Sequence, residues 1–118
     1  VGRFISEFSS RPESILAAIG PAIGPCCYEV DRTVYNAMEN EAEREFFFTA
    51  GREGRWMLDL AAVNRFQLIR AGIPPENISS AEICTACCAS GSEDVFFSHR
   101  RDGGKTGRQF NFILLCPG

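Results

Sequence analysis

Short apolar runs predict strands in the first part of this chain. Ile15 to Ile19 is apolar throughout and lies between Pro12 and Gly20-Pro21, which favours a strand that is buried on both faces. Ile78 to Ile83 alternates between apolar and polar positions, and this alternation predicts another strand. Trp56-Met57 predicts a shorter extended piece between these two strands.

The last quarter of the chain contains two more apolar runs. Asp94 to Ser98 includes three consecutive apolar residues and is predicted to be a strand that ends in a basic loop. Phe110 to Cys116 has apolar residues on both faces that an extended chain presents, so we expect a strand that is central or sandwiched in a sheet.

Three segments have the spacing of helices. Val1 to Phe8 has apolar residues at helical intervals, as in the last turns of a helix whose beginning is missing. Cys26 to Ala42 is predicted to be a helix in which Asp31 is an N-cap or a first-turn acid. Asp59 to Ala71 gives the clearest helical pattern, because its first residue can cap it and Gly72 follows at the position that ends a helix.

These elements predict a fold of the α+β class, with mixed β-sheet layers covered by helices. A chain of 118 residues is of the usual size for one domain, so we expect a single domain over residues 1–118. The pattern does not predict the order of the strands.

Net charge and hydropathy argue against two classes of partner, nucleic acids and membranes. The net charge of −3 argues against nucleic acid, because domains that bind it are usually basic. The longest uncharged run, Ser14 to Tyr28, is too short for a membrane span of about 20 apolar residues, and no signal peptide opens the chain. Cys26-Cys27 and Cys87-Cys88 are adjacent pairs that bridge only with strain, so we expect reduced cysteines and a cytoplasmic location.

The cysteines and the single histidine could bind a metal ion. Cys84-x-x-Cys87, Cys88 and His99 are ligand types, but a structural zinc site normally needs two ligand pairs at set spacing. The second pair would be Cys26-Cys27, and adjacent cysteines are poor chelate partners. We therefore expect small, buried cysteines in a phenylalanine-rich core, and no metal ligand in this chain.

Nucleophilic catalysis is a second possible chemistry. Cys84 or Cys26 together with His99 would form a thiol–imidazole pair, and these three residues are the catalytic candidates. Such a pair requires contact in space, which the spacing along the chain does not provide. The alternative is a histidine with a structural hydrogen bond.

The basic loop after the predicted strand at residues 94–98 is the best candidate for ligand binding. Arg100, Arg101, Lys105 and Arg108 are interspersed with glycines. Guanidinium groups suit phosphate and carboxylate, and glycines expose backbone N–H groups, so the loop could hold an anion. The alternative is a solvated turn in which Asp102 pairs with a neighbour.

Four segments of the sequence resemble those of the multicopper polyphenol oxidase family, also called the laccase-domain or YfiH-like family. They are IGPAIGPCCYEVD at 19–31, LDLAAVN at 58–64, the AGI-then-I spacing at 71–78, and CT…FFSHRRDGGKTGR at 84–108. The resemblance covers nearly the whole chain in order, and it implies the C-terminal half of a layered α/β/β/α fold.

The resemblance also implies an activity for a longer parent protein. Members are described as laccases and as zinc-dependent purine nucleoside phosphorylases, which cleave adenosine, inosine, guanosine or methylthioadenosine with phosphate and also deaminate adenosine. Their metal ligands, two histidines and a cysteine, occur in motifs of the types HG, ADC and HAGWRG, and none of these motifs occurs here. Zinc or copper is therefore expected in the parent protein and not in this chain alone.

For the site, the resemblance suggests that the loop at residues 24–28 and the segment His99–Arg101 approach a ligand pocket. The expected residues for substrate or phosphate are Arg100, Arg101, Arg108, His99, Cys26 and Tyr28. The expected partners are an N-terminal half of the same fold or a second copy, with a nucleoside or phenol and phosphate as small molecules. Two alternatives remain open, a non-catalytic module that needs a partner half and a small Cys/His hydrolase.

Overall fold

The structure is a computed structural model that describes residues 1–38, 41–90 and 93–114. Its elements run along the chain as α1 (Gly2–Phe8), β1 (Ala17–Ile19), β2 (Glu29–Val30), α2 (Arg32–Asn36), α3 (Glu41–Phe47), β3 (Phe48–Ala50), β4 (Trp56–Leu58), α4 (Leu60–Arg70), β5 (Ile78–Ser80), β6 (Ala89–Ser90) and β7 (Glu93–Asp94). Short 3₁₀ turns at Pro12–Ser14 and Pro75–Asn77 precede β1 and β5. The mixed α/β composition confirms the predicted fold class.

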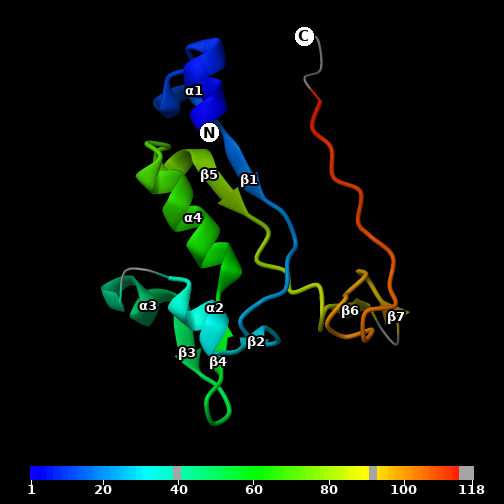
Figure 1. Ribbon diagram of the computed structural model, residues 1–118. Coiled ribbons are helices and arrows are strands. Elements are labelled where there is room, and N and C mark those ends of the chain that lie inside the picture. Colours follow the sequence, from blue (N-terminus) through cyan, green and yellow to red (C-terminus); the bar gives the residue numbers. More distant parts are fainter. Residues whose placement is uncertain (39–40, 91–92, 115–118) are drawn as a thin grey trace.

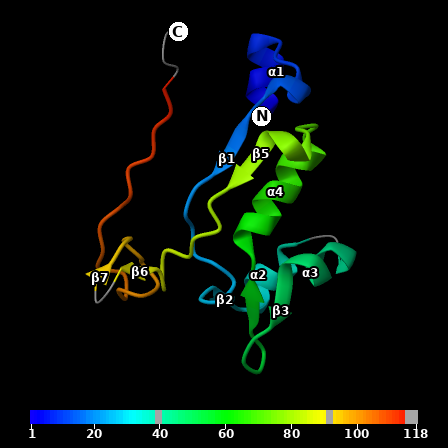
Figure 2. The same cartoon turned by 180° about the vertical axis from the view of Figure 1, so that it is seen from behind.

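Two sheets and a hairpin make up the β-structure of the described residues. β1 and β5 pair in parallel, with Ala17 opposite Ile78, and α4 lies alongside this pair (Figure 1). β2, β4 and β3 form an antiparallel sheet in that order, and β6 pairs with β7. Figure 2 shows the β6–β7 hairpin set to one side of both sheets.

The principal core cluster lies where the antiparallel sheet meets α4. Its buried members are Val30, Phe47, Phe48, Leu58 and Val63, and several half-buried side chains pack against them. Of the three consecutive phenylalanines at residues 46–48, the last two are buried in this cluster, while Phe46 stays 78% exposed.

Both ends of α4 are fixed by local hydrogen bonds that the sequence predicts. Asp59 accepts a hydrogen bond from the N–H of Ala62, which caps the helix as predicted. At the other end Gly72 has φ +94°, and the N–H groups of Gly72 and Ile73 donate to Ile69 and Leu68. This is the Schellman ending, and Ile73 is the most buried large side chain of the described residues.

The predicted helix from Cys26 to Ala42 is wrong in its extent. The structure has a turn at residues 25–27, then β2, then α2, and α3 begins at Glu41. Asp31 is nevertheless an N-cap, because its carboxylate accepts from the N–H groups of Thr33 and Val34. A helix beginning at Asp31 leaves the preceding residues free to form a turn and a strand.

Three strand predictions also need correction. β1 is shorter than predicted, and it is not buried on both faces, since Leu16 just before it is 79% exposed. Between Asp94 and Ser98 only the first residue belongs to a strand. Residues 110–114 form no strand and are highly exposed, while the rest of that prediction lies outside the described residues. Apolar runs indicate surface that needs burial, and these surfaces are not covered by other described residues.

Candidate functional site

Parallel pairing of β1 and β5 places the segments that follow them side by side. Ala22 and Cys84 form a parallel bridge, the N–H of Ala22 donates to Ile83 at 3.2 Å, and the N–H of Thr85 donates to Ala22 at 3.0 Å. The pairing therefore continues past the strands and joins two turns that are distant in sequence.

Both turns are closed by backbone hydrogen bonds. The N–H groups of Cys27 and Tyr28 donate to the carbonyl of Gly24, and the N–H of Cys88 donates to the carbonyl of Cys84, all at 3.0 Å. A Cβ at Gly24 would lie 3.2 Å from the Cβ of Cys84 and 3.4 Å from the Sγ of Cys26. A glycine at position 24 is therefore what lets the turns approach this closely.

Four cysteines from the two turns form one cluster. The Sγ atoms of Cys26, Cys27, Cys84 and Cys87 all lie within 4.8 Å of one another, and Cys26 and Cys87 are 3.5 Å apart. The expectation that the cysteines are buried in the core is wrong, because Cys26 and Cys87 are exposed and the other two are half-buried. This set of ligand atoms could hold a metal ion.

The environment of the thiols separates their pKa values. Burial opposes ionisation of Cys84, but hydrogen bonds from the backbone N–H groups of Gly24, Ala86 and Cys87 outweigh it and lower its pKa to about 6. Cys26 shares a hydrogen bond with Cys87, and this contact together with burial raises the pKa of Cys26 to about 12. Cys84 therefore becomes a thiolate at a lower pH than Cys26 does.

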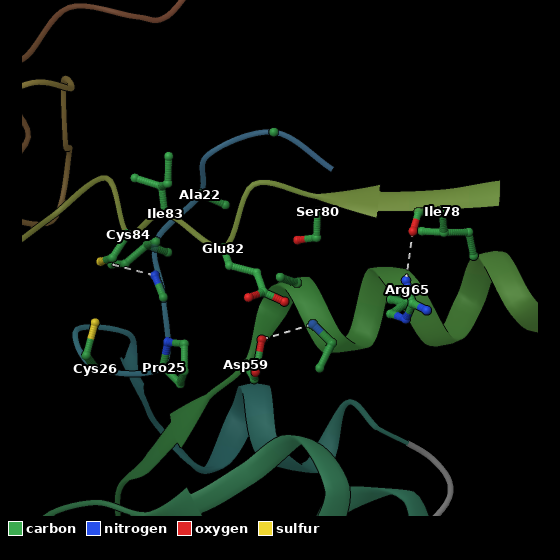
Figure 3. Close-up of a pocket in the computed structure, with 15 residues that line it drawn as sticks. Ala22, Pro25, Cys26, Asp59, Arg65, Ile78, Ser80, Glu82, Ile83 and Cys84 are labelled. Atoms are coloured by element: carbon green, nitrogen blue, oxygen red, sulfur yellow. Dashed lines mark hydrogen bonds between the residues drawn. The ribbon is translucent and has the colours of Figure 1, made fainter. Parts of the chain in front are cut away.

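A pocket of about 730 Å³ lies beside the cluster, between α4 and the β1–β5 pair. In Figure 3, Cys26 and Cys84 lie at one end of this pocket and Arg65 lies toward the other. Asp59 caps α4, and the guanidinium of Arg65 donates to the carbonyl of Ile78 at 3.0 Å. Arg65 thus joins α4 to the first residue of β5.

A second pocket, of about 520 Å³, gathers most of the residues expected to bind substrate or phosphate. Tyr28, His99, Arg100 and Arg108 line it together with Thr106, Gln109 and Asn111, and no aspartate or glutamate is among its lining residues. Ala22 and Ile23 line both pockets, so the loop at residues 20–25 is their common wall.

Arg100 lines this pocket and is held there by contacts with its neighbours. Its Nη1 donates to the carbonyl of Glu29 at 2.8 Å, and its guanidinium carbon lies 5.4 Å from the centre of the Tyr28 ring. Glu29 in turn is paired with Arg52, which holds the pKa of that carboxyl down to about 2. Because only Nη1 of Arg100 donates to the carbonyl of Glu29, its other guanidinium N–H groups can donate to a ligand.

Arg101 is used differently, because its guanidinium joins four parts of the chain. It donates to the carbonyls of Phe96 at 2.9 Å and Thr85 at 3.3 Å, and it contacts the carboxylates of Asp102 at 2.8 Å and Asp94 at 3.1 Å. This arginine does not line either pocket. Arg101 therefore connects the basic loop to the turn at residues 84–88.

The thiol–imidazole pairs considered from the sequence are not assembled. His99 lines the second pocket, Cys26 and Cys84 line the first, and no hydrogen bond between His99 and either thiol is found in the described part of the chain. The ring of His99 lies against the glycine turn, where a Cβ at Gly104 would be 3.4 Å from its Cε1.

Three residues of the site, Asp102, Cys27 and Cys87, enter the sequence-based predictions only in alternatives that were not preferred, a solvated turn and a zinc site. Asp102 accepts hydrogen bonds from Arg101, from the hydroxyl of Thr106 at 2.7 Å and from the N–H of Ser98 at 3.2 Å. Cys27 and Cys87 complete the cysteine cluster. A signal for the cysteines was present, since Cys26 and Cys87 are 61 residues apart, the same offset that relates Ala17 to Ile78.

Comparison with known proteins shows which family the chain is similar to. The family model described as multi-copper polyphenol oxidoreductase laccase matches residues 1–116. The purine nucleoside phosphorylase YlmD of Geobacillus stearothermophilus is 45% identical over 104 residues, which are 86% of this chain and 36% of that protein. The human purine nucleoside phosphorylase LACC1 is 33% identical over 117 residues, 98% of this chain and 26% of that protein.

Solved structures show the same similarity in three dimensions. The crystal structure of the Bacillus licheniformis hypothetical protein YfiH matches with a TM-score of 0.80 and 42% identity over 90% of this chain and 39% of that one. YlmD from Geobacillus stearothermophilus matches with a TM-score of 0.74 and 39% identity, over 90% of this chain and 38% of that one. The chain therefore has the fold of part of these proteins and spans about two-fifths of their length.

Proposed function

Because the chain belongs to the multi-copper polyphenol oxidoreductase laccase family, we propose that these residues are part of a purine nucleoside phosphorylase. In this proposal the second pocket supplies one wall of the nucleoside and phosphate site. The observation that carries it is the convergence of Arg100, Arg108, His99 and Tyr28 on one pocket whose lining residues include no carboxylate.

The chemistry of this wall suits the two substrates of phosphorolysis. Arg100 and Arg108 offer guanidinium N–H groups, which bind phosphate oxygens by charge-assisted hydrogen bonds. Tyr28 presents a ring to the same pocket, and aromatic faces stack on purine bases. The hydroxyl of Thr106 and the amides of Gln109 and Asn111 add neutral polar groups for a ribose.

The catalytic metal implied by the family resemblance does not fit the residues of this chain. That resemblance implies two histidines and one cysteine as ligands, and the chain contains a single histidine, His99, which makes no hydrogen bond to a described cysteine. We therefore assign zinc or copper chemistry of the parent protein to residues beyond these 118, and assign substrate positioning to the pocket described here.

The test is an assay of the intact protein for phosphate-dependent release of hypoxanthine from inosine. Arg100→Ala and Arg108→Ala should each raise the KM for phosphate by about tenfold or more, the usual effect of losing a hydrogen bond to a charged group. Arg55→Ala is the matched control, because Arg55 is an exposed arginine that lines neither pocket. Phosphorolysis that is unaffected by either pocket variant would refute the assignment.

A second candidate is favoured by the exposed apolar surface of the chain. Phe110, Phe112, Ile113 and Leu114 are each more than two-thirds exposed. In this alternative the chain is a non-catalytic module that docks on an N-terminal half of the same fold or on a second copy. A phosphorolysis assay that detects no base release, combined with a stable complex in size-exclusion chromatography, would favour it over the enzyme.

The location is a further part of the proposal, and it rests on the cysteines. None of the helices in the described part of the chain combines the length and the apolar character that crossing a bilayer requires. The five described cysteines are free thiols, and free thiols are typical of a reducing compartment. We propose the cytoplasm, which thiol mapping by alkylation in intact cells would test.

A further inference from the structure

The cluster of Cys26, Cys27, Cys84 and Cys87 has no role in the function proposed above. It lies at the joint between the two turns, and it contains four thiols at a spacing that packing alone does not require. Two of these cysteines are exposed and two are half-buried, so the cluster is accessible from solvent. Accessible thiols grouped in this way either bind a soft metal or oxidise to a disulfide.

The distances between the sulfurs match a tetrahedral site. A Zn²⁺ ion with four thiolates has Zn–S bonds of about 2.3 Å, which places neighbouring sulfurs about 3.8 Å apart. Cys26 and Cys87 are 3.5 Å apart, and all four sulfurs lie within 4.8 Å of one another. Shifts of less than about 1 Å would therefore give four bonds of normal length.

The turns supply the surroundings that metal-bound thiolates need. Cys84-x-x-Cys87 lies on a tight turn, and the backbone N–H of Gly24 donates to the Sγ of Cys84 at 3.2 Å. Such N–H groups stabilise the negative charge of a thiolate and orient it toward the metal. Adjacent cysteines are usually poor chelate partners. Here the sulfurs of Cys26 and Cys27 both lie within 4.8 Å of those in the other turn, so both can bind the same ion.

We propose that Cys26, Cys27, Cys84 and Cys87 bind one structural Zn²⁺ ion, separate from any catalytic metal of the parent protein. On binding, each thiol that is still protonated gives its proton to solvent, and four Zn–S bonds form without a change of oxidation state. The ion joins the loop at residues 20–28 to the turn at residues 84–88. It thereby fixes the wall that the two pockets share and the position of Tyr28.

The test uses the intact protein, reduced and loaded with zinc, and compares metal content by mass spectrometry. Cys84→Ser and Cys87→Ser should each lose one equivalent of zinc relative to the wild type. Cys88→Ser is the matched control, because Cys88 lies next to the cluster in sequence but outside it in space. It should keep the full metal content. Equal zinc content in all four proteins would overturn the proposal.

Two measurements on the wild-type protein avoid any dependence on how variants fold. Substitution with Co²⁺ should give the thiolate charge-transfer and d–d bands of a tetrahedral sulfur site. Bound zinc should slow alkylation of the four cluster cysteines and leave the rate at Cys88 unchanged. An octahedral cobalt spectrum, or a Cys26–Cys87 disulfide in protein that takes up no zinc after reduction, would contradict the proposal.

Discussion

At the scale of single residues, Asp102 joins three parts of the basic loop. Its carboxylate accepts from the Arg101 guanidinium at 2.8 Å, from the Thr106 hydroxyl at 2.7 Å and from the N–H of Ser98 at 3.2 Å. The hydrogen bonds from Thr106 and Arg101 hold the pKa of Asp102 below its ordinary value. The loop is therefore folded around an ionised carboxylate.

Asp102→Asn should lower the melting temperature at neutral pH, because the charge-assisted hydrogen bonds become neutral ones. A carboxyl group whose pKa is lowered in the folded state adds stability above its unfolded pKa of about 3.9, and this contribution is lost as the pH falls through the lower folded value. The variant should thus show a weaker loss of stability between neutral and acidic pH. Thermal unfolding from pH 7 down to acid measures both effects, and parallel curves for the two proteins would contradict them.

The same scale shows what the sequence could not predict. The two guanidinium groups at Arg100 and Arg101 are equivalent in sequence, and both were expected to face the ligand. The structure assigns one to the pocket lining and the other to Asp94, Asp102 and two carbonyls. Which of two adjacent arginines finds internal acceptors depends on how distant carbonyls are placed, and sequence spacing does not contain that information.

At the scale of elements, the end of α4 is fixed by a left-handed glycine. Gly72 has φ +94°, and a Cβ there would lie 3.0 Å from the Cβ of Pro12. Gly54 also has a positive φ, +69°, but a Cβ there would meet nothing within 4 Å. Substituting Gly54 would therefore introduce backbone strain alone, whereas substituting Gly72 would add a steric collision to that strain.

Gly54→Ala should destabilise the fold by about 1–2 kcal/mol, which is the cost of placing a Cβ in the left-handed region. Gly72→Ala should cost more, because the new methyl group also collides with Pro12. Urea unfolding of both variants provides the comparison. An equal loss for the two would mean that Pro12 yields without cost.

Sequence patterns predicted elements well where local chemistry decides them. The caps at Asp31 and Asp59 and the glycine ending of α4 were all predicted, since each depends on residues within one turn. The predicted strand over residues 110–116 failed for the described part because a strand needs a neighbour to pair with. The grouping of Cys26-Cys27 with Cys84 and Cys87 was considered and set aside for the same reason, since it depends on the parallel register of β1 and β5.

At the scale of the whole molecule, the C-terminal segment extends away from the other elements (Figures 1 and 2). Residues 110–114 make no backbone hydrogen bond to other parts of the described chain, and their large apolar side chains are exposed. A segment with this composition is stabilised when it adds to another sheet or packs under another layer. We propose that the remaining part of the fold, or a second copy, covers it.

Hydrogen–deuterium exchange of the intact protein checks this proposal. Amides of residues 110–114 should exchange much more slowly than those of an unpaired chain, because a docked strand forms backbone hydrogen bonds. Glu53 and Gly54, in the turn between β3 and β4, are an internal control that should exchange quickly, since both are exposed and their N–H groups make no backbone hydrogen bond within the described residues. Rapid exchange at both places would show that the segment is not covered.

The central claim is that Arg100 and Arg108 form an anion-binding wall, and calorimetric titration of the intact protein with inorganic phosphate tests it most directly. The wild type and Arg55→Ala should bind phosphate alike, whereas the Arg100→Ala, Arg108→Ala double variant should bind at least about a hundredfold more weakly. A double variant that folds normally and binds phosphate as tightly as the wild type would contradict the account.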